Sequence, residues 1–145
     1  MSADNGCELC AGTGGALVWK DAGWRVIRVA DAAFPAFYRV VCQRHVGEFT
    51  DLDADERGRC IALVAAVERV LRDSLAPTKI NLASLGNLTP HLHWHVIARF
   101  DWDSHYPQPV WGGAQRVLTF APAAWLALPL QRLDTRVAEA LRAVH

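Results

Sequence analysis

The sequence lacks an excess of charge of either sign. Its 145 residues include 15 Lys plus Arg and 15 Asp plus Glu, so the formal net charge at neutral pH is zero. A strongly basic surface is what attracts a protein to nucleic acid or to an anionic membrane. We therefore expect no nucleic acid and no membrane among its partners, and any phosphate must be bound by local groups.

The sequence also lacks a long apolar run. No stretch approaches the roughly 18 apolar residues of a membrane-spanning helix. The N-terminal MSADNGCELC has neither the basic region nor the apolar region of a secretion signal. These absences predict a cytoplasmic protein. In that compartment its four cysteines are expected to be thiols or metal ligands rather than disulfides.

Repeats, low-complexity tracts and long linkers are absent as well. The length fits one domain, residues 1–145, that buries roughly two thirds of the surface of its unfolded chain. Apolar and Trp-containing segments at 17–20, 24–29 and 38–42 are typical of short strands, with turn signals between them. This pattern predicts an antiparallel meander.

The next segment has the periodicity of a helix. Asp53 and Glu56 have the spacing of a capping box, and Pro77 terminates the pattern. Apolar residues recur between them at the spacing of a core-facing stripe: Ile61, Val64, Val67, Leu71 and Leu75. Residues 79–84 then predict another strand. A second apolar stripe, Leu133, Val137, Leu141 and Val144, predicts a C-terminal helix.

Three histidines occupy alternate positions in the stretch HLHWHVI. Alternate side chains of a strand share one face, so His91, His93 and His95 are expected to form a row, with the apolar residues between them on the other face. Imidazoles titrate near neutral pH and serve as base, acid, nucleophile or metal ligand. The row is therefore the candidate site of chemistry.

In every position this stretch resembles the signature of the histidine triad (HIT) family, in which three histidines alternate with apolar residues. The order of the predicted elements is also similar to that family, over a core of about residues 7–111 with a C-terminal extension at 112–145. In detail the chain looks most like a bacterial branch with an N-terminal CxxC and a PHLHWH triad. The resemblance implies an α+β fold in which a sheet of about five antiparallel strands carries one long helix and a C-terminal helix, and it implies a homodimer.

The resemblance also implies a nucleotide hydrolase or transferase. Such an enzyme cleaves a bond at the α-phosphorus of a nucleoside phosphoramidate or a dinucleoside polyphosphate, with a purine nucleotide expected. The middle histidine, His93, corresponds to the family's nucleophile and implies a nucleotidyl-histidine intermediate. His95 corresponds to the residue that serves the leaving group, and His91 to an orienting residue. The alternative is a nucleotide-binding, zinc-stabilised module with little turnover.

Residues before the triad are the candidates for binding the substrate. Asn81 lies where family members often have a polar residue near the nucleotide. Gly86 and Asn87 form a turn whose N–H groups and amide suit a phosphoryl oxygen, and Thr89 is two residues further on. An ordinary tight turn explains the Gly-Asn pair equally well.

Two family features are not matched. Many members carry a fourth histidine at the position of Phe37, whose apolar ring cannot form the corresponding hydrogen bond. No acidic residue aligns well with the family's ribose-binding carboxylate. Asp31 is the nearest, and we interpret it as a loop residue.

The cysteines predict a metal site. Cys7 and Cys10 have a spacing suited to one zinc ion. In a zinc-binding subset of the family, the histidine of the RH pair and the first triad histidine complete the site, which implies His45 and His91 here. Two reduced thiols near the N-terminus are the alternative. Cys42 and Cys60 lie in apolar segments and are expected to be buried packing residues.

The segment after the triad is not expected to be a central strand, because it contains Pro107 and Pro109. Its Trp111 is interpreted either as a cover over a neighbouring site or as an anchor at the dimer interface. His105 and His145 show no partner pattern and are expected at the surface.

Overall fold

Five short strands form one antiparallel sheet in the computed structural model, which describes residues 6–145. The strands are β1 (Ala16–Lys20), β2 (Trp24–Arg28), β3 (Phe37–Cys42), β4 (Lys79–Ala83) and β5 (His93–Arg99), and their order in the sheet is β1-β2-β3-β5-β4. The predicted α+β fold and its meander are confirmed. The row of histidines lies on or next to β5, between β3 and β4.

The long helix α2 (Ala54–Leu75) begins with the predicted capping box. The Asp53 carboxylate accepts a hydrogen bond from the backbone N–H of Glu56, and the Glu56 carboxylate accepts one from the N–H of Asp53. The helix ends at Leu75, and its C-cap residue Ala76 adopts the left-handed conformation before Pro77. The prediction that Ile61 belongs to the buried stripe was wrong. Ile61 is 45% exposed, because the buried stripe runs through Cys60 and Leu63 instead.

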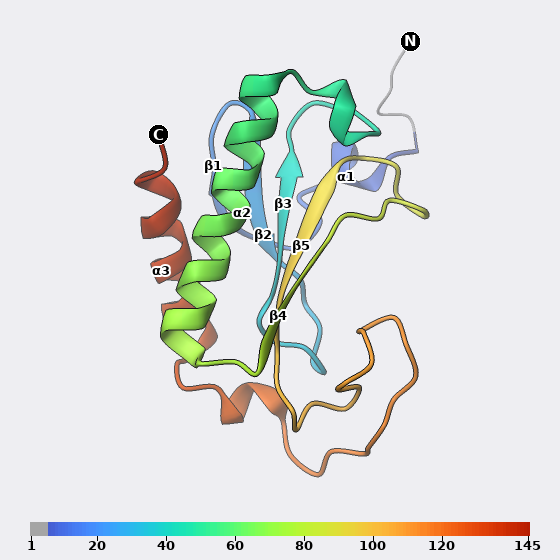
Figure 1. The fold of residues 1–145 in the computed structure, drawn as a ribbon, viewed down its shortest axis with the longest axis vertical. Coiled ribbons are helices and arrows are strands. Elements are labelled where there is room, and N and C mark those ends of the chain that lie inside the picture. Colours follow the sequence, from blue (N-terminus) through green and yellow to red (C-terminus); the bar gives the residue numbers. More distant parts are fainter. Residues whose placement is uncertain (1–5) are drawn as a thin grey trace.

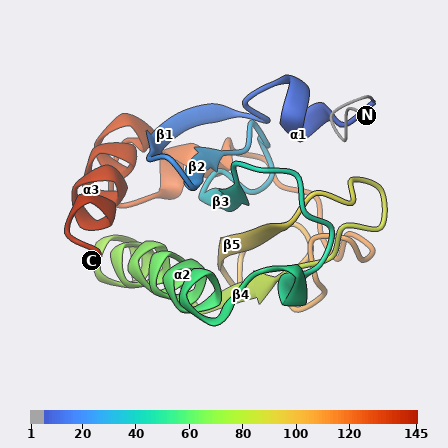
Figure 2. The ribbon, with the colours of Figure 1, turned by 90° about the horizontal axis from the view of Figure 1, so that it is seen from above.

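The helix α3 (Leu130–Arg142) lies beside α2, and both helices lie on the same side of the sheet (Figures 1 and 2). Leu133, Val137 and Leu141 are buried as predicted, whereas Val144 lies beyond the end of the helix and is only partly buried. A half-buried ion pair of Arg28 with Asp134 joins α3 to the sheet.

Alternate residues of the strands pack beneath these helices. Their side chains form the main core together with the buried stripes of α2 and α3: Val26, Tyr38, Val40, Val96 and Ala98. The histidine row belongs to the opposite alternation, in which Arg39 pairs with His95 and Val41 with His93. The row therefore faces away from the two long helices.

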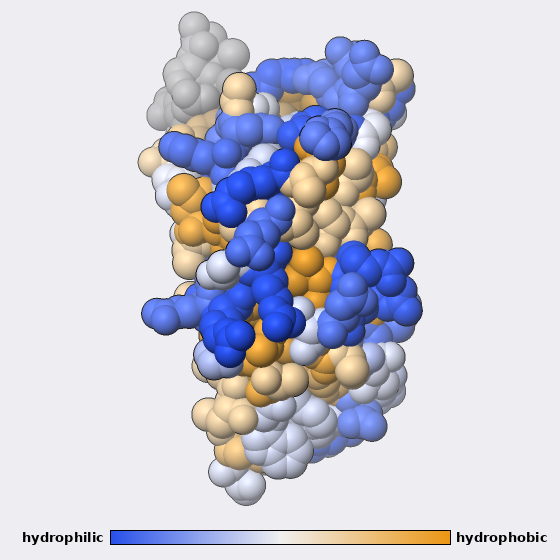
Figure 3. Space-filling view, turned by 90° about the vertical axis from the view of Figure 1, so that its left-hand side faces the viewer, coloured by the Kyte–Doolittle hydropathy of each residue, from blue (hydrophilic) through white to orange (hydrophobic). Residues whose placement is uncertain are grey.

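The side of the molecule where α3 lies carries both kinds of surface, because charged and polar side chains lie among apolar areas (Figure 3). Among the described residues, no helix is both long enough and apolar enough to cross a membrane.

Two irregular segments complete the face that carries the histidines. A short helix, α1 (Glu8–Ala11), lies on the side of the sheet away from α2 (Figure 2). It contains Cys10, and Cys7 directly precedes it. Residues 100–121 form no strand, as the two prolines predicted, and lead through a short 3-10 helix (Pro122–Trp125) to α3. A further 3-10 turn (Phe49–Asp51) precedes α2.

Candidate functional site: a histidine row between a four-donor cluster and a cavity

The three histidines form a row, although the strand itself begins later than predicted. β5 starts at His93, and His91 lies just before it. The alternation still holds, because Leu92 enters the main core while His91 does not. All three imidazoles are buried.

His91 is fully buried, and each of its ring nitrogens has a defined surrounding. Nε2 lies 2.6 Å from the carbonyl oxygen of Cys42, so Nε2 carries the proton and donates it. Nδ1 therefore keeps its lone pair and faces Cys7, Cys10 and His45. Burial lowers the pKa of His91 and favours the neutral ring, which is the form that binds metals.

Cys7, Cys10, His45 and His91 bring their donor atoms within 4.8 Å of one another. The Sγ of Cys10 lies 3.2 Å from Nδ1 of His45 and 3.3 Å from Nδ1 of His91, and the two Nδ1 atoms are 3.2 Å apart. A tetrahedral zinc site requires about 3.5 Å between sulfur and nitrogen ligands and about 3.3 Å between two nitrogens. The two thiols and two imidazoles thus fit zinc in both spacing and chemistry, and they are the four residues predicted.

Arg25 holds the cysteine-bearing segment in place, a role that the sequence did not reveal. Its guanidinium donates hydrogen bonds to the backbone carbonyls of Leu9 and Thr13 and to the side chain of Gln43. Arg25 is itself buried on β2. A spacing rule for metal ligands cannot find such a residue, since it contacts the backbone of the ligand segment rather than the donors.

His93 is oriented by its neighbour. Its Nδ1 lies 2.6 Å from the carbonyl oxygen of His91, so Nδ1 carries the proton and Nε2 keeps a lone pair. The Ser84 hydroxyl donates to the carbonyl of His93 at 2.9 Å. Burial lowers the pKa of His93. The result is a neutral imidazole with a single nitrogen available as a nucleophile.

His95 lies in an aromatic setting. Its ring makes edge contacts with Phe37 at 5.4 Å and with Trp111 at 5.2 Å between centroids. On the adjacent strand, Arg39 donates from Nε to Nδ1 of His95 over 3.4 Å. Burial lowers the pKa of His95 to about 3, and the charges of His93 and Arg39 act in the same direction.

Arg39 is a second residue of the candidate site that the sequence did not reveal. It lies two residues after Phe37 on β3 and therefore shares its face. That alternation was the available signal, because Phe37 was already aligned with a residue of the site.

His93 and His95 open into a cavity of about 420 Å³. The predicted residues Gly86, Asn87 and Thr89 line the same cavity, and Gly86 has a φ of +86°, which favours glycine. The complete lining is Glu8, Leu9, Arg39, Leu85, Gly86, Asn87, Leu88, Thr89, His93, His95 and Trp111. A cavity with an arginine, two imidazoles and a glycine turn suits a phosphorylated ligand.

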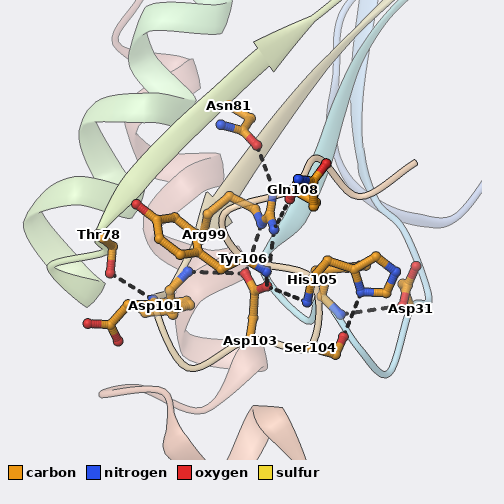
Figure 4. Close-up of polar contacts among 12 residues, drawn as sticks. Asp31, Thr78, Asn81, Arg99, Asp101, Asp103, Ser104, His105, Tyr106 and Gln108 are labelled. Carbon is orange, nitrogen blue, oxygen red and sulfur yellow. Dashed lines mark hydrogen bonds and ion pairs between the residues drawn. The ribbon is translucent and has the colours of Figure 1, made fainter. Parts of the chain in front are cut away.

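Asn81 lies elsewhere on the same face. It pairs with Ile97 rather than with a histidine, and its amide oxygen accepts a hydrogen bond of 2.9 Å from Arg99 (Figure 4). Asn81 lines a neighbouring hollow of about 610 Å³. Trp111 lines both this hollow and the cavity and lies between them.

Arg99 also fixes the loop that carries Trp111. Its guanidinium forms a buried, two-pronged ion pair with Asp103 and donates to the carbonyl of Gln108 (Figure 4). The Asp103 carboxylate accepts backbone hydrogen bonds from Phe100, His105 and Tyr106. The network fixes the loop whose Trp111 contacts the ring of His95 in the same chain.

The other predicted residues have structural positions. Cys42 and Cys60 are buried, as expected. Asp31 accepts hydrogen bonds from the backbone N–H groups of Ala33 and Phe34, which is consistent with the loop interpretation. His105 is half-buried against Phe34 rather than at the surface, whereas His145 is exposed.

The chain belongs to the HIT family: the model of the HIT domain matches residues 14–102. Membership supports activity as a nucleotide hydrolase or transferase in general terms. No curated protein matches the chain.

Solved structures agree with this assignment. A histidine triad protein from Bradyrhizobium japonicum is 29% identical, with 91% of each chain covered and a TM-score of 0.68. One from Marinobacter aquaeolei is 22% identical over 95% of this chain and 96% of that one, with a TM-score of 0.72. A Zn-bound family member from Mycobacterium smegmatis is 17% identical over 97% and 96%, with a TM-score of 0.63. The latter two show a common fold.

Proposed function

We propose that this protein cleaves a bond at the α-phosphorus of a nucleoside phosphoramidate or a dinucleoside polyphosphate and passes the nucleotidyl group through His93. The observation that carries the proposal is the hydrogen bond between Nδ1 of His93 and the carbonyl of His91. This hydrogen bond leaves Nε2, which carries the lone pair, as the reactive atom of a neutral ring. Membership in the HIT family supports the same reaction class.

Each step uses residues around the cavity. Nε2 of His93 attacks phosphorus, and the bond between phosphorus and the leaving group breaks. His95, two residues along, is the group that meets the departing atom. The N–H groups of the turn at Gly86 and Asn87 and the guanidinium of Arg39 line the cavity where the phosphoryl oxygens gain charge. Water then releases the nucleotide from His93.

A structural zinc ion belongs to this proposal. Cys7, Cys10, His45 and His91 would hold it, and the Zn-bound relative from Mycobacterium smegmatis supports the assignment. The metal would tie the segment of α1 to the start of β5 and contribute to the free energy of folding. His91 is then a ligand first, and its backbone carbonyl orients His93.

A purine nucleotide as ligand and a homodimer complete the proposal. Both come from the family resemblance. β1 and β4 are the edges of the sheet, and Leu82 on β4 is 45% exposed, so β4 offers an edge for a second copy. Sedimentation at several concentrations tests this, and a monomer at every concentration would contradict it.

Pre-steady-state kinetics test the function. The 4-nitrophenyl ester of adenosine 5′-monophosphate should give a burst of nitrophenolate of about one equivalent per site, followed by slower turnover. The second candidate function, a zinc-stabilised nucleotide-binding module, remains because Phe37 replaces the family's fourth histidine. A binder of that kind would bind adenosine 5′-monophosphate but give neither burst nor turnover.

A further inference from the structure

Arg39 meets His95 at the side of the cavity. It lies directly opposite His95 in the register of β3 with β5, and its Nε–H donates to Nδ1 of the imidazole. Within residues 6–145, the two terminal nitrogens of Arg39, Nη1 and Nη2, form no hydrogen bond and no ion pair with another residue. The guanidinium therefore has one donor directed at His95 and further donors left in the cavity wall.

This contact fixes the protonation of the ring. A guanidinium has donors and no acceptor, so Nδ1 of His95 must act as the acceptor and cannot carry a proton. The single proton of the neutral ring lies on Nε2. An imidazolium would place an N–H against the N–H of Arg39 and a positive charge beside a guanidinium.

The other neighbours of His95 do not favour a second proton. Phe37 and Trp111 pack against the ring and carry no carboxylate. His93 is on the same strand, and Ala83 is opposite on β4. The carboxylate in the cavity lining is Glu8 of α1, whose charge acts on Arg39 and His93.

Resting on the function proposed above, we propose that Arg39 holds His95 as a neutral hydrogen-bond donor and so makes the site selective for leaving groups that depart as stable anions. Phosphate and polyphosphate chains are such groups, whereas amines must be protonated in order to leave. Arg39 is a positioning residue in this scheme and determines specificity through His95.

The reaction balances without an acid. Nε2 of His93 forms a bond to phosphorus, the bridging P–O bond breaks, and its electron pair leaves on the oxygen of the departing phosphate. Nε2–H of His95 hydrogen-bonds to that oxygen and keeps its proton, because giving it up would produce an imidazolate. Water then forms a bond to phosphorus, the P–N bond to His93 breaks, and the proton of water passes to solvent.

The Nη1 and Nη2 groups of Arg39 favour the same class of substrate. Guanidinium groups bind phosphate oxygens in a forked geometry, and a polyphosphate chain carries such oxygens beyond the α-phosphorus. An amine leaving group offers none. Arg39 thus acts on both the chemistry and the binding of the leaving group.

The test compares three donors of adenosine 5′-monophosphate: diadenosine tetraphosphate, an alkylamine phosphoramidate and the 4-nitrophenyl ester. For the native chain, kcat/KM should be at least about a hundredfold higher for the tetraphosphate than for the phosphoramidate. General acid catalysis contributes a factor of at least about this size, and the site lacks the acid that the departing amine needs. Arg39→Met should narrow this ratio at least about tenfold. Arg69→Met, which removes an exposed charge on α2, should leave it unchanged.

A nitrogen NMR spectrum of the native chain gives a readout independent of activity. Long-range ¹⁵N–¹H correlations should place the proton of His95 on Nε2, and Arg39→Met should yield a mixture of both forms. The spectrum and the ratio of the native chain test the proposal even if Arg39→Met does not fold.

Three results would overturn the proposal: equal cleavage of phosphoramidate and tetraphosphate, a native His95 protonated at Nδ1, or an Arg39→Met variant that slows both donors by the same factor. The nitrophenyl ester separates a failure of the specificity proposal from a failure of the proposed function, because its leaving group needs no proton and the proposed function alone predicts its cleavage. If the native chain does not turn over that ester, the proposed function fails, and the specificity proposal fails with it.

Discussion

His91 and His95 lie at the two ends of one row, and both keep a lone pair on Nδ1 and a proton on Nε2. At His91 the lone pair faces two thiols and a second imidazole. At His95 it is occupied by the guanidinium of Arg39. In the function proposed above, the same residue in the same ring form thus binds a metal at one end of the row and serves the leaving group at the other.

The difference shows that residues outside the strand determine the chemical surroundings of each histidine. Spacing places the three rings on one face, which is a property of the strand alone. α1 and the connection after β3 supply the metal-ligand partners, whereas Arg39 on β3 and the loop after β5 supply the partners of His95. Substitutions at each end should therefore have separable effects.

The largest expected effect lies between the two ends. His93→Asn should lower kcat by at least about a thousandfold, because it removes the covalent step, while the affinity for adenosine 5′-monophosphate changes by less than about tenfold. Burst kinetics and equilibrium titration measure the two quantities. His145→Asn, which removes an exposed imidazole, is the control, and near-native turnover by His93→Asn would refute the nucleophile assignment.

At the metal end, the native chain purified without chelator should contain one zinc ion per chain. Cys7→Ser should lose it and lower the free energy of unfolding by about 3 kcal/mol, roughly 10 °C in melting temperature. Cys60→Ala removes a buried thiol outside the cluster and should keep the zinc. A zinc-free native chain, with a Cys7→Ser variant of unchanged melting temperature, would contradict the metal site.

At the other end, the buried neutral His95 predicts a pH dependence of stability. Its pKa is about 3 in the folded chain and about 6.5 when unfolded, so below pH 6.5 the unfolded state binds a proton that the folded state does not. Its contribution is therefore present above about pH 6.5 and lost on acidification. Between about pH 6.5 and 5 the loss should be roughly 1–2 kcal/mol.

Urea unfolding of the native chain and of His95→Asn, each at several pH values, isolates the contribution of His95. The loss of free energy of unfolding on acidification is measured for each protein, and the two losses are compared. The variant should lose less stability on acidification than the native chain. Identical pH profiles for the two proteins would show that His95 accepts a proton while folded.

The smallest expected effect concerns the aromatic wall of His95. Trp111 is half-exposed, so Trp111→Ala should cost about 0.5–1.5 kcal/mol of stability through its contact with His95. Trp125→Ala is matched in exposure and stacks on Phe120, outside the cavity lining. We expect only Trp111→Ala to change turnover of nucleotide esters, and equal rates in both variants would exclude Trp111 from the site.

Local spacing was enough to predict the strands, the capping box at Asp53, the histidine row and the cysteine pair, and the structure has them. The family resemblance was needed to add His45 and His91 as the other two metal donors, and the structure brings them to the cysteines. Arg25, Arg39 and Arg99 were missed because their partners are distant in the chain or come together only through strand register and loop packing. Ile61 was misassigned since a shift of one residue turns a helical stripe by about 100°. Periodicity therefore predicts which residues share a face, whereas contacts between elements decide what each of them does.

The most direct test of the central claim is to locate the covalent intermediate. The native chain is mixed with the 4-nitrophenyl ester of adenosine 5′-monophosphate, quenched during the burst, digested and sequenced by mass spectrometry. We predict an adenylyl group on His93, with none on His91 or His95. An adenylyl group on either end of the row, or its absence from all three during measured turnover, would contradict the roles assigned to the three histidines.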